Sequence, residues 1–326
     1  MVFPAQRPRR LRRTAALRRL VAETALRVDD LVAPLFVRQG IDEPQPVPSL
    51  PGVVQHTVAS LRAEVQRLRD LGVPALILFG VPARKDARGS EAWNPDGIVQ
   101  VALRELREEV GDDVVLMADL CVDEYTDHGH CGILRADGSV DNDATLAIYQ
   151  QAAVAQATAG AHVCAPSGMM DGQVAAIRSA LDGTGHADTA ILAYAAKYAS
   201  ALYGPFRDAV DVTIRSGDRK GYQQDWRNAR EALSEVLADV AEGADMVMVK
   251  PAVTYLDVIA RTRAAVHVPL GAYHVSGEYA MIAAAAERGW IDGPAVALEQ
   301  LTAVKRAGAD FVLTYFAAGM AEALGA

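Results

Sequence analysis

The chain has 326 residues, of which 51% are hydrophobic, and a formal net charge of −9. This length can bury a large core in one α/β domain or in two smaller ones, and no apolar run approaches the ~18 residues of a membrane span. The negative charge disfavours a general nucleic-acid binder. Three cysteines are too few for a disulfide framework, so a reducing cytoplasm is the expected compartment.

The N-terminal segment is basic although the chain as a whole is acidic. The stretch QRPRRLRRTAALRRL carries seven arginines before the first acidic residue, Glu23. It fits a transit peptide, a nucleic-acid-binding arm or an arm that docks on a neighbouring subunit. The lack of an apolar stretch excludes a secretory signal, and the scarcity of serine argues against a transit peptide. Because the rest of the chain is acidic and can receive it, we expect residues 1–28 to be an arm for subunit contacts.

Short apolar runs recur along the rest of the chain and predict eight strands. They are rich in Val, Leu, Ile and Ala and span residues 31–37, 75–80, 114–120, 161–166, 190–197, 245–251, 269–276 and 311–317. Amphipathic segments that end near glycine predict helices between them, among them residues 58–72, 144–160, 229–243 and 294–309. Near-continuous apolar strands that alternate with helices predict a parallel sheet covered on both faces.

The number of these units favours a (β/α)8 barrel, or TIM barrel, over residues 29–326. A doubly wound sheet also alternates strands and helices, but no G-x-G-x-x-G follows the first strand. The active site of a (β/α)8 barrel lies at the carboxyl ends of its strands. Two long polar segments, residues 82–97 and 215–230, follow strands and can cover that end. The second is rich in glycine and charge and predicts a mobile lid.

A group of metal-binding residue types follows the third predicted strand. The segment ADLCVDEYTDHGHCG places Cys121, Asp123 and Cys131 on a loop at a strand end. Two thiolates and one carboxylate can converge on a tetrahedral ion and leave a fourth position open. Zinc suits the sulfur ligands, the carboxylate lets magnesium compete, and His128 and His130 are further ligands or partners of ligands. The alternative is a loop of ordinary polar groups and free thiols.

Lysine is rare in this chain, since only five of its 32 basic residues are lysine. Two of the five, Lys197 and Lys250, end predicted strands, so both amines point toward the same barrel mouth. Burial and a nearby cation lower the pKa of a lysine, and a neutral amine can attack a carbonyl to form a Schiff base. Alternatively, each side chain reaches solvent or pairs with a carboxylate such as Asp119 or Asp245. Two strand-end lysines in a lysine-poor chain favour the catalytic interpretation.

Residues that suit a carboxylate-bearing substrate follow the later strands. Arg207 comes after the fifth predicted strand, and Arg219 and Gln223 lie in the predicted lid. A guanidinium group binds a carboxylate through two parallel hydrogen bonds. Ser276 and Tyr315, at the ends of the last two predicted strands, can donate to a second carboxylate.

Together these motifs resemble the porphobilinogen synthase family, also called 5-aminolevulinate dehydratase. The likeness runs nearly end to end and includes RPRRLRRT, HGHCG, AYAAKYAS, YGPFR, GADMVMVKPA and YHVSGEYAMI. The resemblance implies a (β/α)8 barrel assembled as a homo-octamer through its N-terminal arms. It also implies the condensation of two molecules of 5-aminolevulinate to porphobilinogen, with loss of two waters, in the synthesis of tetrapyrroles and heme.

The same resemblance implies a role for each matching residue. Lys250 would form a Schiff base with the substrate that becomes the propionate side of the product, and Lys197 with the substrate that becomes the acetate side. The other implied substrate contacts are Ser276 and Tyr315 for the first carboxylate, Arg207, Arg219 and Gln223 for the second, and Asp119 and Ser167 in the lining of the site.

Two sites depart from the family pattern. Zinc-dependent members carry three cysteines where this chain has Cys121, Asp123 and Cys131, which predicts weaker zinc binding than three thiolates would give. Glu235 matches the family's ligand for an allosteric magnesium ion. The Asp and Arg that support this ion through its waters are Gly168 and Gln173 here.

Other functions also fit parts of the sequence. A class I aldolase-like lyase would use one Schiff-base lysine on the same fold, and the second lysine argues against it. A non-catalytic scaffold with exchanged arms, or a nucleic-acid binder that uses the arginine arm, would belong to a different class. Salt-dependent binding to DNA or RNA would support the nucleic-acid binder, but the acidic body argues against it.

Overall fold

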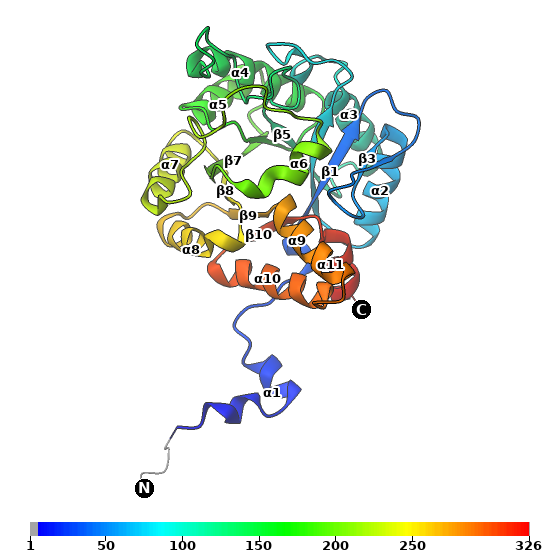
Figure 1. Ribbon diagram of the computed structural model, residues 1–326, viewed down its shortest axis with the longest axis vertical. Coiled ribbons are helices and arrows are strands. Elements are labelled where there is room, and N and C mark those ends of the chain that lie inside the picture. The colour runs from blue at the N-terminus through cyan, green and yellow to red at the C-terminus, as the bar shows by residue number, and fades with distance from the viewer. Residues whose placement is uncertain (1–5, 326) are drawn as a thin grey trace.

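The structure, a computed structural model, describes residues 6–325. Within them, parallel strands close into a barrel because β10 pairs with β1 (Figure 1). Around the barrel the strands are β1 Leu31–Arg38, β4 Ala75–Val81, β5 Val115–Leu120, β6 Val163–Pro166, β7 Ala190–Lys197, β8 Met246–Lys250, β9 Leu270–His274 and β10 Phe311–Thr314. This confirms the predicted (β/α)8 barrel, and each of its eight strands falls on a predicted apolar run.

The main differences from the prediction lie at strand ends and beside β1. The runs predicted over 269–276 and 311–317 are longer than β9 and β10, and Ser276 is the first residue of a helix rather than the last of a strand. Two short strands that were not predicted, β2 Gln45–Pro46 and β3 Val54–His56, form an antiparallel pair next to β1. They are too short to produce an apolar run in the sequence.

Most of the helices surround the barrel and lie between its strands in the sequence (Figure 1). Their bounds are α2 Val58–Asp70, α3 Ile98–Val110, α4 Asn142–Thr158, α5 Gln173–Gly183, α6 Gly204–Ala209, α7 Ala229–Ala241, α8 Leu256–Ala265, α9 Ser276–Glu287, α10 Gly293–Ala307 and α11 Ala317–Gly325. The four helices predicted by residue range correspond to α2, α4, α7 and α10. The helices of the described residues include none that combines the length and apolar character of a membrane span.

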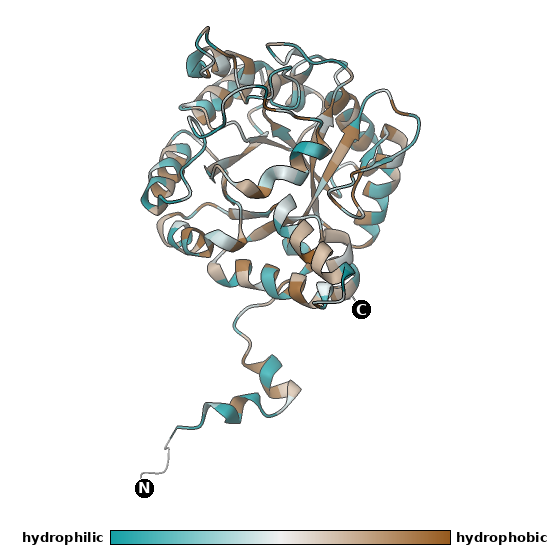
Figure 2. Cartoon of the chain, in the orientation of Figure 1, coloured by the Kyte–Doolittle hydropathy of each residue, from teal (hydrophilic) through white to brown (hydrophobic). Residues whose placement is uncertain are grey.

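Two hydrophobic cores hold the barrel, one on each face of the strands. Residues that alternate along the strands fill the interior, for example Phe36, Ile77, Leu192, Met248 and Leu313. The intervening residues pack against the helices, and Figure 2 shows largely brown, apolar strands enclosed by helices that carry both teal and brown residues. This alternation decides which strand-end side chains can reach the barrel mouth.

The N-terminal arm projects away from the barrel (Figure 1). It contains a 3-10 helix, Pro8–Arg12, and α1 Ala15–Leu20, and neither buries a side chain. Leu11 is 53% exposed and Leu20 is 80% exposed. Residues 1–5 of the predicted arm lie outside the described residues, and the division into an arm over 1–28 and a barrel over 29–326 stays a prediction.

Candidate active site

Lys197 and Lys250 lie side by side at the carboxyl end of the barrel, where they are direct register partners of β7 and β8. On β8, Lys250 follows the interior residue Met248 by two positions and therefore points inward. On β7, one extra residue between Ala193 and Ala196 shifts the register. This β-bulge turns Lys197 inward as well, whereas an unbroken strand would direct it toward the helices.

The amine of Lys250 is enclosed by aromatic rings. Its Nζ lies 4.5 Å from the ring centre of Tyr273 and 5.1 Å from those of Tyr194, Tyr203 and Phe206, and the residue is only 5% exposed. Burial, together with the positive charge of Lys197, lowers the pKa of Lys250 to about 7. A large share of this amine is therefore neutral and nucleophilic near neutral pH.

The lowered pKa predicts how the reactivity of Lys250 depends on pH. Only the neutral amine attacks a carbonyl, so imine formation should rise between about pH 6 and about pH 8 and then level off, since the pKa is about 7. An unperturbed lysine, with a pKa near ~10.4, would keep gaining about tenfold per pH unit above pH 8. The rate of trapping with cyanoborohydride across this range measures the difference, and a continued rise above pH 8 contradicts the lowered pKa.

Asp119 and Ser167 lie next to the two lysines. The Ser167 hydroxyl donates to Asp119 Oδ2 at 3.0 Å, and the Lys197 amine donates to the backbone carbonyl of Ser167. Burial raises the pKa of Asp119 to about 6, against the opposing effect of the charges on Lys197 and Lys250. A carboxyl group with this pKa can both accept and release a proton at neutral pH. Asp245, by contrast, lies at the opposite end of β8 and accepts a hydrogen bond from Ile191 N.

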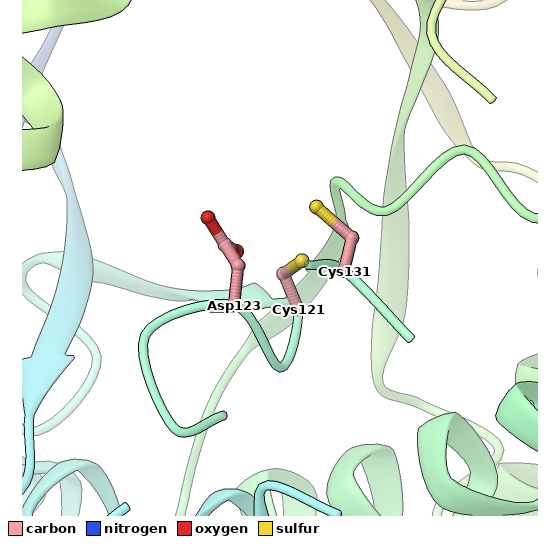
Figure 3. A group of neighbouring side chains, drawn as sticks. All are labelled: Cys121, Asp123 and Cys131. Atoms are coloured by element: carbon pink, nitrogen blue, oxygen red, sulfur yellow. The ribbon is translucent and has the colours of Figure 1, made fainter. Parts of the chain in front are cut away.

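Cys121, Asp123 and Cys131 converge as the sequence predicts. One ligand atom from each lies within 4.8 Å of the others, all three residues are buried, and Figure 3 shows the side chains directed toward a common space. Two sulfur ligands at ~2.3 Å from a tetrahedral zinc ion lie ~3.8 Å apart, so this arrangement fits such an ion. The two histidines of the loop are not members of this group, which is the one group of three such residues found among residues 6–325.

The charges around this group favour a cation. Although burial disfavours its charge, Asp123 keeps a pKa well below its usual range, chiefly because Arg219 pairs with it at 2.7 Å. Burial raises the pKa of the Cys121 thiol. The pKa of Cys131 is lowered, against its own burial, by a hydrogen bond from Cys121 and by Arg219. A bound metal ion would deprotonate the thiols, and it would share Asp123 with Arg219.

Arg207, Arg219 and Gln223 offer donors near this group. The Nε atoms of both arginines and Nε2 of Gln223 are buried and have no hydrogen-bond partner within the described part of the chain. Burial and the neighbouring charge of Arg219 lower the pKa of Arg207. Two adjacent guanidinium groups with unused donors can bind an anion, because a carboxylate would satisfy both.

Ser276 and Tyr315 lie on the side of β8, β9 and β10. The Ser276 hydroxyl accepts from Phe206 N at 3.1 Å and donates to Leu202 O at 3.2 Å. The Tyr315 hydroxyl lies 3.1 Å from that of Tyr273, whose ring contacts Lys250. Phe206, whose backbone N–H donates to Ser276, also has its ring against Lys250, so each hydroxyl is one residue away from a ring that contacts this amine. The two arginines lie near Asp123 of the cysteine loop instead.

The segment 215–230 packs over the barrel mouth. His130 Nε2 contacts Ser216 O at 2.8 Å, and Gln224 N donates to Lys197 O at 3.0 Å. His130 therefore holds this segment against the cysteine loop. The position agrees with the predicted lid, and its mobility stays a prediction.

Glu235 lies apart from the lysines, on α7. It lines a cavity of about 380 Å³ together with Asp171, Glu231 and Asn142, and Gln223 of the predicted lid lines the same cavity. Burial, with the charges of Asp171 and Glu231, raises the pKa of Glu235. A cation in this cavity would relieve that repulsion and would lie beside the lid.

Sequence reasoning missed the aromatic enclosure of Lys250. Tyr194 lies three residues before Lys197, Tyr203 and Phe206 lie in the helical segment after β7, and Tyr273 lies on β9. The tyrosine in AYAAK was the available signal, because a tyrosine before a strand-end lysine can flank its amine. The Tyr194 hydroxyl is buried and has no partner in the described chain.

Two buried amines at the carboxyl end of a (β/α)8 barrel, beside two arginines with unpaired donors, are typical of barrel enzymes that act on carbonyl compounds through lysine. Comparison with known proteins gives the family. The chain belongs to the delta-aminolevulinic acid dehydratase family, whose sequence profile matches residues 5–323.

The alignments with similar proteins cover nearly the full length of this chain. The delta-aminolevulinic acid dehydratase of Mycobacterium tuberculosis is 60% identical over 317 residues, which cover 97% of this chain and 96% of that protein. The Streptomyces coelicolor enzyme is 57% identical over 324 residues, which cover 99% of this chain and 98% of that protein. The crystal structure of the Toxoplasma gondii enzyme (porphobilinogen synthase) in complex with the reaction product porphobilinogen superposes with a TM-score of 0.95 at 45% identity, over 98% of this chain and 92% of that one.

Proposed function

We propose that this chain is a hydro-lyase that condenses two molecules of 5-aminolevulinate to porphobilinogen with loss of two waters, in tetrapyrrole and heme synthesis. Family membership supports porphobilinogen synthesis. The proposed chemistry rests on one observation: Lys197 and Lys250 are register partners at the carboxyl ends of β7 and β8. A reaction that joins two ketones through lysine needs two amines this close together.

Lys250 captures the first substrate. Its neutral amine adds to the ketone carbon, the carbonyl oxygen leaves as water, and a Schiff base forms. Ser276 and Tyr315, near the Lys250 side, hold the carboxylate of this substrate. The aromatic rings around Nζ exclude water and keep the amine from being fully protonated.

Lys197 captures the second substrate in the same way. Arg207, Arg219 and Gln223 hold its carboxylate with donors that are otherwise unpaired. Asp119, with its pKa of about 6, lies close enough to the two amines to take and return protons as bonds form between the substrates. Ser167 orients Asp119 through the hydrogen bond to Oδ2.

Product formation tests this function. Purified chain supplied with 5-aminolevulinate should release one porphobilinogen for every two substrates consumed, because each product contains the carbon atoms of two substrate molecules. A chain that consumes the substrate but returns a single-substrate product would instead support an aldolase-like lyase, and no consumption would exclude both.

Cys121, Asp123 and Cys131 would hold zinc beside this site. Zinc there would act as a Lewis acid toward substrate oxygen or nitrogen. Magnesium competes for the site because one ligand is a carboxylate. With two thiolates in place of three, affinity for zinc is expected to be lower.

Zinc content tests this loop. Cys131→Ala should reduce the zinc retained per chain after dialysis against a defined zinc buffer, because one of two thiolate ligands is lost. Cys164→Ala is the matched control, since Cys164 is also buried and free but stands outside the group. Elemental analysis measures the difference. Absence of zinc in the parent, or equal zinc in both variants, contradicts a zinc site here.

Glu235 would contribute a direct ligand to an allosteric magnesium ion in the cavity beside the lid. The raised pKa of Glu235 and the nearby acidic residues support a cation there. Gly168 and Gln173 supply no charge in support of this ion, unlike the Asp and Arg of the family pattern. Magnesium activation that survives Glu235→Ala would oppose this site.

The arm supports assembly into a homo-octamer. Its leucines are exposed and its arginines are positive, whereas the whole chain carries a charge of −9, so a neighbouring subunit can cover the arm. Sedimentation should show a large assembly for the full chain and a smaller one after removal of residues 1–28. An unchanged size would oppose this role.

Three free, buried cysteines agree with a cytoplasmic location, and recovery of the chain in a secreted fraction would oppose it.

A further inference from the structure

Glu278 is a buried carboxylate in the first turn of α9 and has no part in the site described so far. It is 2% exposed. Its Oε2 accepts hydrogen bonds from Val275 N at 2.7 Å and Ala252 N at 3.5 Å, and its Oε1 accepts from Val253 N at 2.7 Å. A buried carboxylate with unsatisfied oxygens would be costly, and these backbone donors satisfy both oxygens.

The donors belong to the segments that leave two neighbouring strands. Ala252 and Val253 lie two and three residues after Lys250, the last residue of β8, and Val275 follows β9. A glutamate that only capped α9 would need the single bond to Val275. Glu278 also reaches the backbone just beyond Lys250, so one carboxylate joins the ends of β8 and β9.

The backbone of Lys250 is held from its other side too. Its carbonyl oxygen accepts from Tyr198 N at 2.9 Å and from the Tyr203 hydroxyl at 3.3 Å. The Lys250 side chain itself lies among aromatic rings, which restrain direction less strictly than hydrogen bonds do. The position of Nζ therefore depends on how firmly the backbone around Lys250 is fixed.

Burial raises the pKa of Glu278 to about 7, while the hydrogen bonds from the backbone oppose that rise. The N-terminal turn of α9 adds a favourable dipole for the charged form. An apolar side chain would fill the same space without this desolvation cost, but it could not join the two loops.

We propose that Glu278 is a positioning residue for Lys250, which it holds in place by fixing the backbone after β8 against the start of α9. This role rests on the proposed function of Lys250 as a Schiff-base lysine. A displacement of the amine by a fraction of an ångström to 1 Å is enough to slow capture of a carbonyl on the order of 10- to 100-fold.

Glu278→Gln tests the role with a side chain of the same size. The amide keeps one acceptor oxygen but turns an NH₂ group toward a backbone N–H. Glutamine therefore cannot accept hydrogen bonds from the segments after β8 and β9 with both of its side-chain end atoms. We expect trapping of 5-aminolevulinate at Lys250 to slow about 10-fold or more relative to trapping at Lys197, with a fall in kcat larger than any change in KM. Peptide mapping after cyanoborohydride reduction gives the two trapping rates.

Asp245→Asn is the matched control. Asp245 is a carboxylate on the segment leading into the same strand, and it accepts Ile191 N at 2.8 Å at the end remote from Lys250. Its loss should leave the ratio of the two trapping rates unchanged. If Glu278→Gln does not fold, as judged by circular dichroism, then Glu278→Asp provides the comparison, because it keeps the charge but withdraws it by one methylene group from the donors.

The outcomes separate this role from the proposed function. If the parent is not trapped at Lys250, the proposed function of that lysine fails. Suppose the parent is trapped at Lys250 and a folded Glu278 variant keeps the parental ratio of the trapping rates at Lys250 and Lys197. The positioning role is then overturned, whether both rates are unchanged or both fall equally. A selective loss at Lys250 supports it.

Discussion

Lys250→Met should lower porphobilinogen formation on the order of 10⁴-fold or more, because the amine that captures the first ketone is removed. Methionine has a similar length and can pack among the rings of Tyr273 and Phe206, and it removes a charge that burial disfavours. The thermal stability of the variant should therefore be equal to or higher than that of the parent. Steady-state assays and thermal melts measure the two effects.

Lys305→Met is the control for this change. Lys305 pairs with Asp30 at 3.0 Å, away from Lys250, and should be dispensable for turnover. A Lys250→Met protein that retains more than a few per cent of parental activity would show that another amine performs the capture.

Lys197→Met should also lower product formation, on the order of 10³-fold, but for a different reason. The first substrate would still form a Schiff base at Lys250, while the second would lose its amine. Because the charge of Lys197 lowers the pKa of Lys250, that pKa should rise in the variant, and trapping at Lys250 at neutral pH should slow.

This variant also distinguishes the condensation from an aldolase-like reaction. If the reaction is aldolase-like and uses only Lys250, the Lys197→Met variant would keep its turnover. The adduct at Lys250 would then be processed normally. Accumulation of a Lys250 adduct without product is the result expected for two substrates. Mass spectrometry of the reduced protein, alongside the product assay, decides between them.

The barrel was predictable because its strands are apolar on both faces. A run such as MVMV in β8 packs alternately inward and outward, so it stands out from amphipathic helices. The pair β2 and β3 was missed since two or three residues at the rim produce no such run. Ser276 was placed at a strand end, although the Ser-Gly-Glu sequence begins a helix there.

The site was predictable where strand ends set it. Lys197 was expected at the mouth from its place at the end of an apolar run. Its inward direction depends on the bulge after Ala193, which the sequence AYAAK does not reveal. The pairing of Asp123 with Arg219 and the anchoring of the Lys250 backbone by Glu278 join segments far apart in the chain. Local patterns carry no information about such contacts.

The central claim is that both lysines form Schiff bases with 5-aminolevulinate. Parent protein is incubated with this substrate, reduced with borohydride, digested and mapped by mass spectrometry. Adducts at Lys250 and Lys197, and none at Lys85, Lys220 or Lys305, are the predicted result. Labelling at neither Lys250 nor Lys197 would contradict the account.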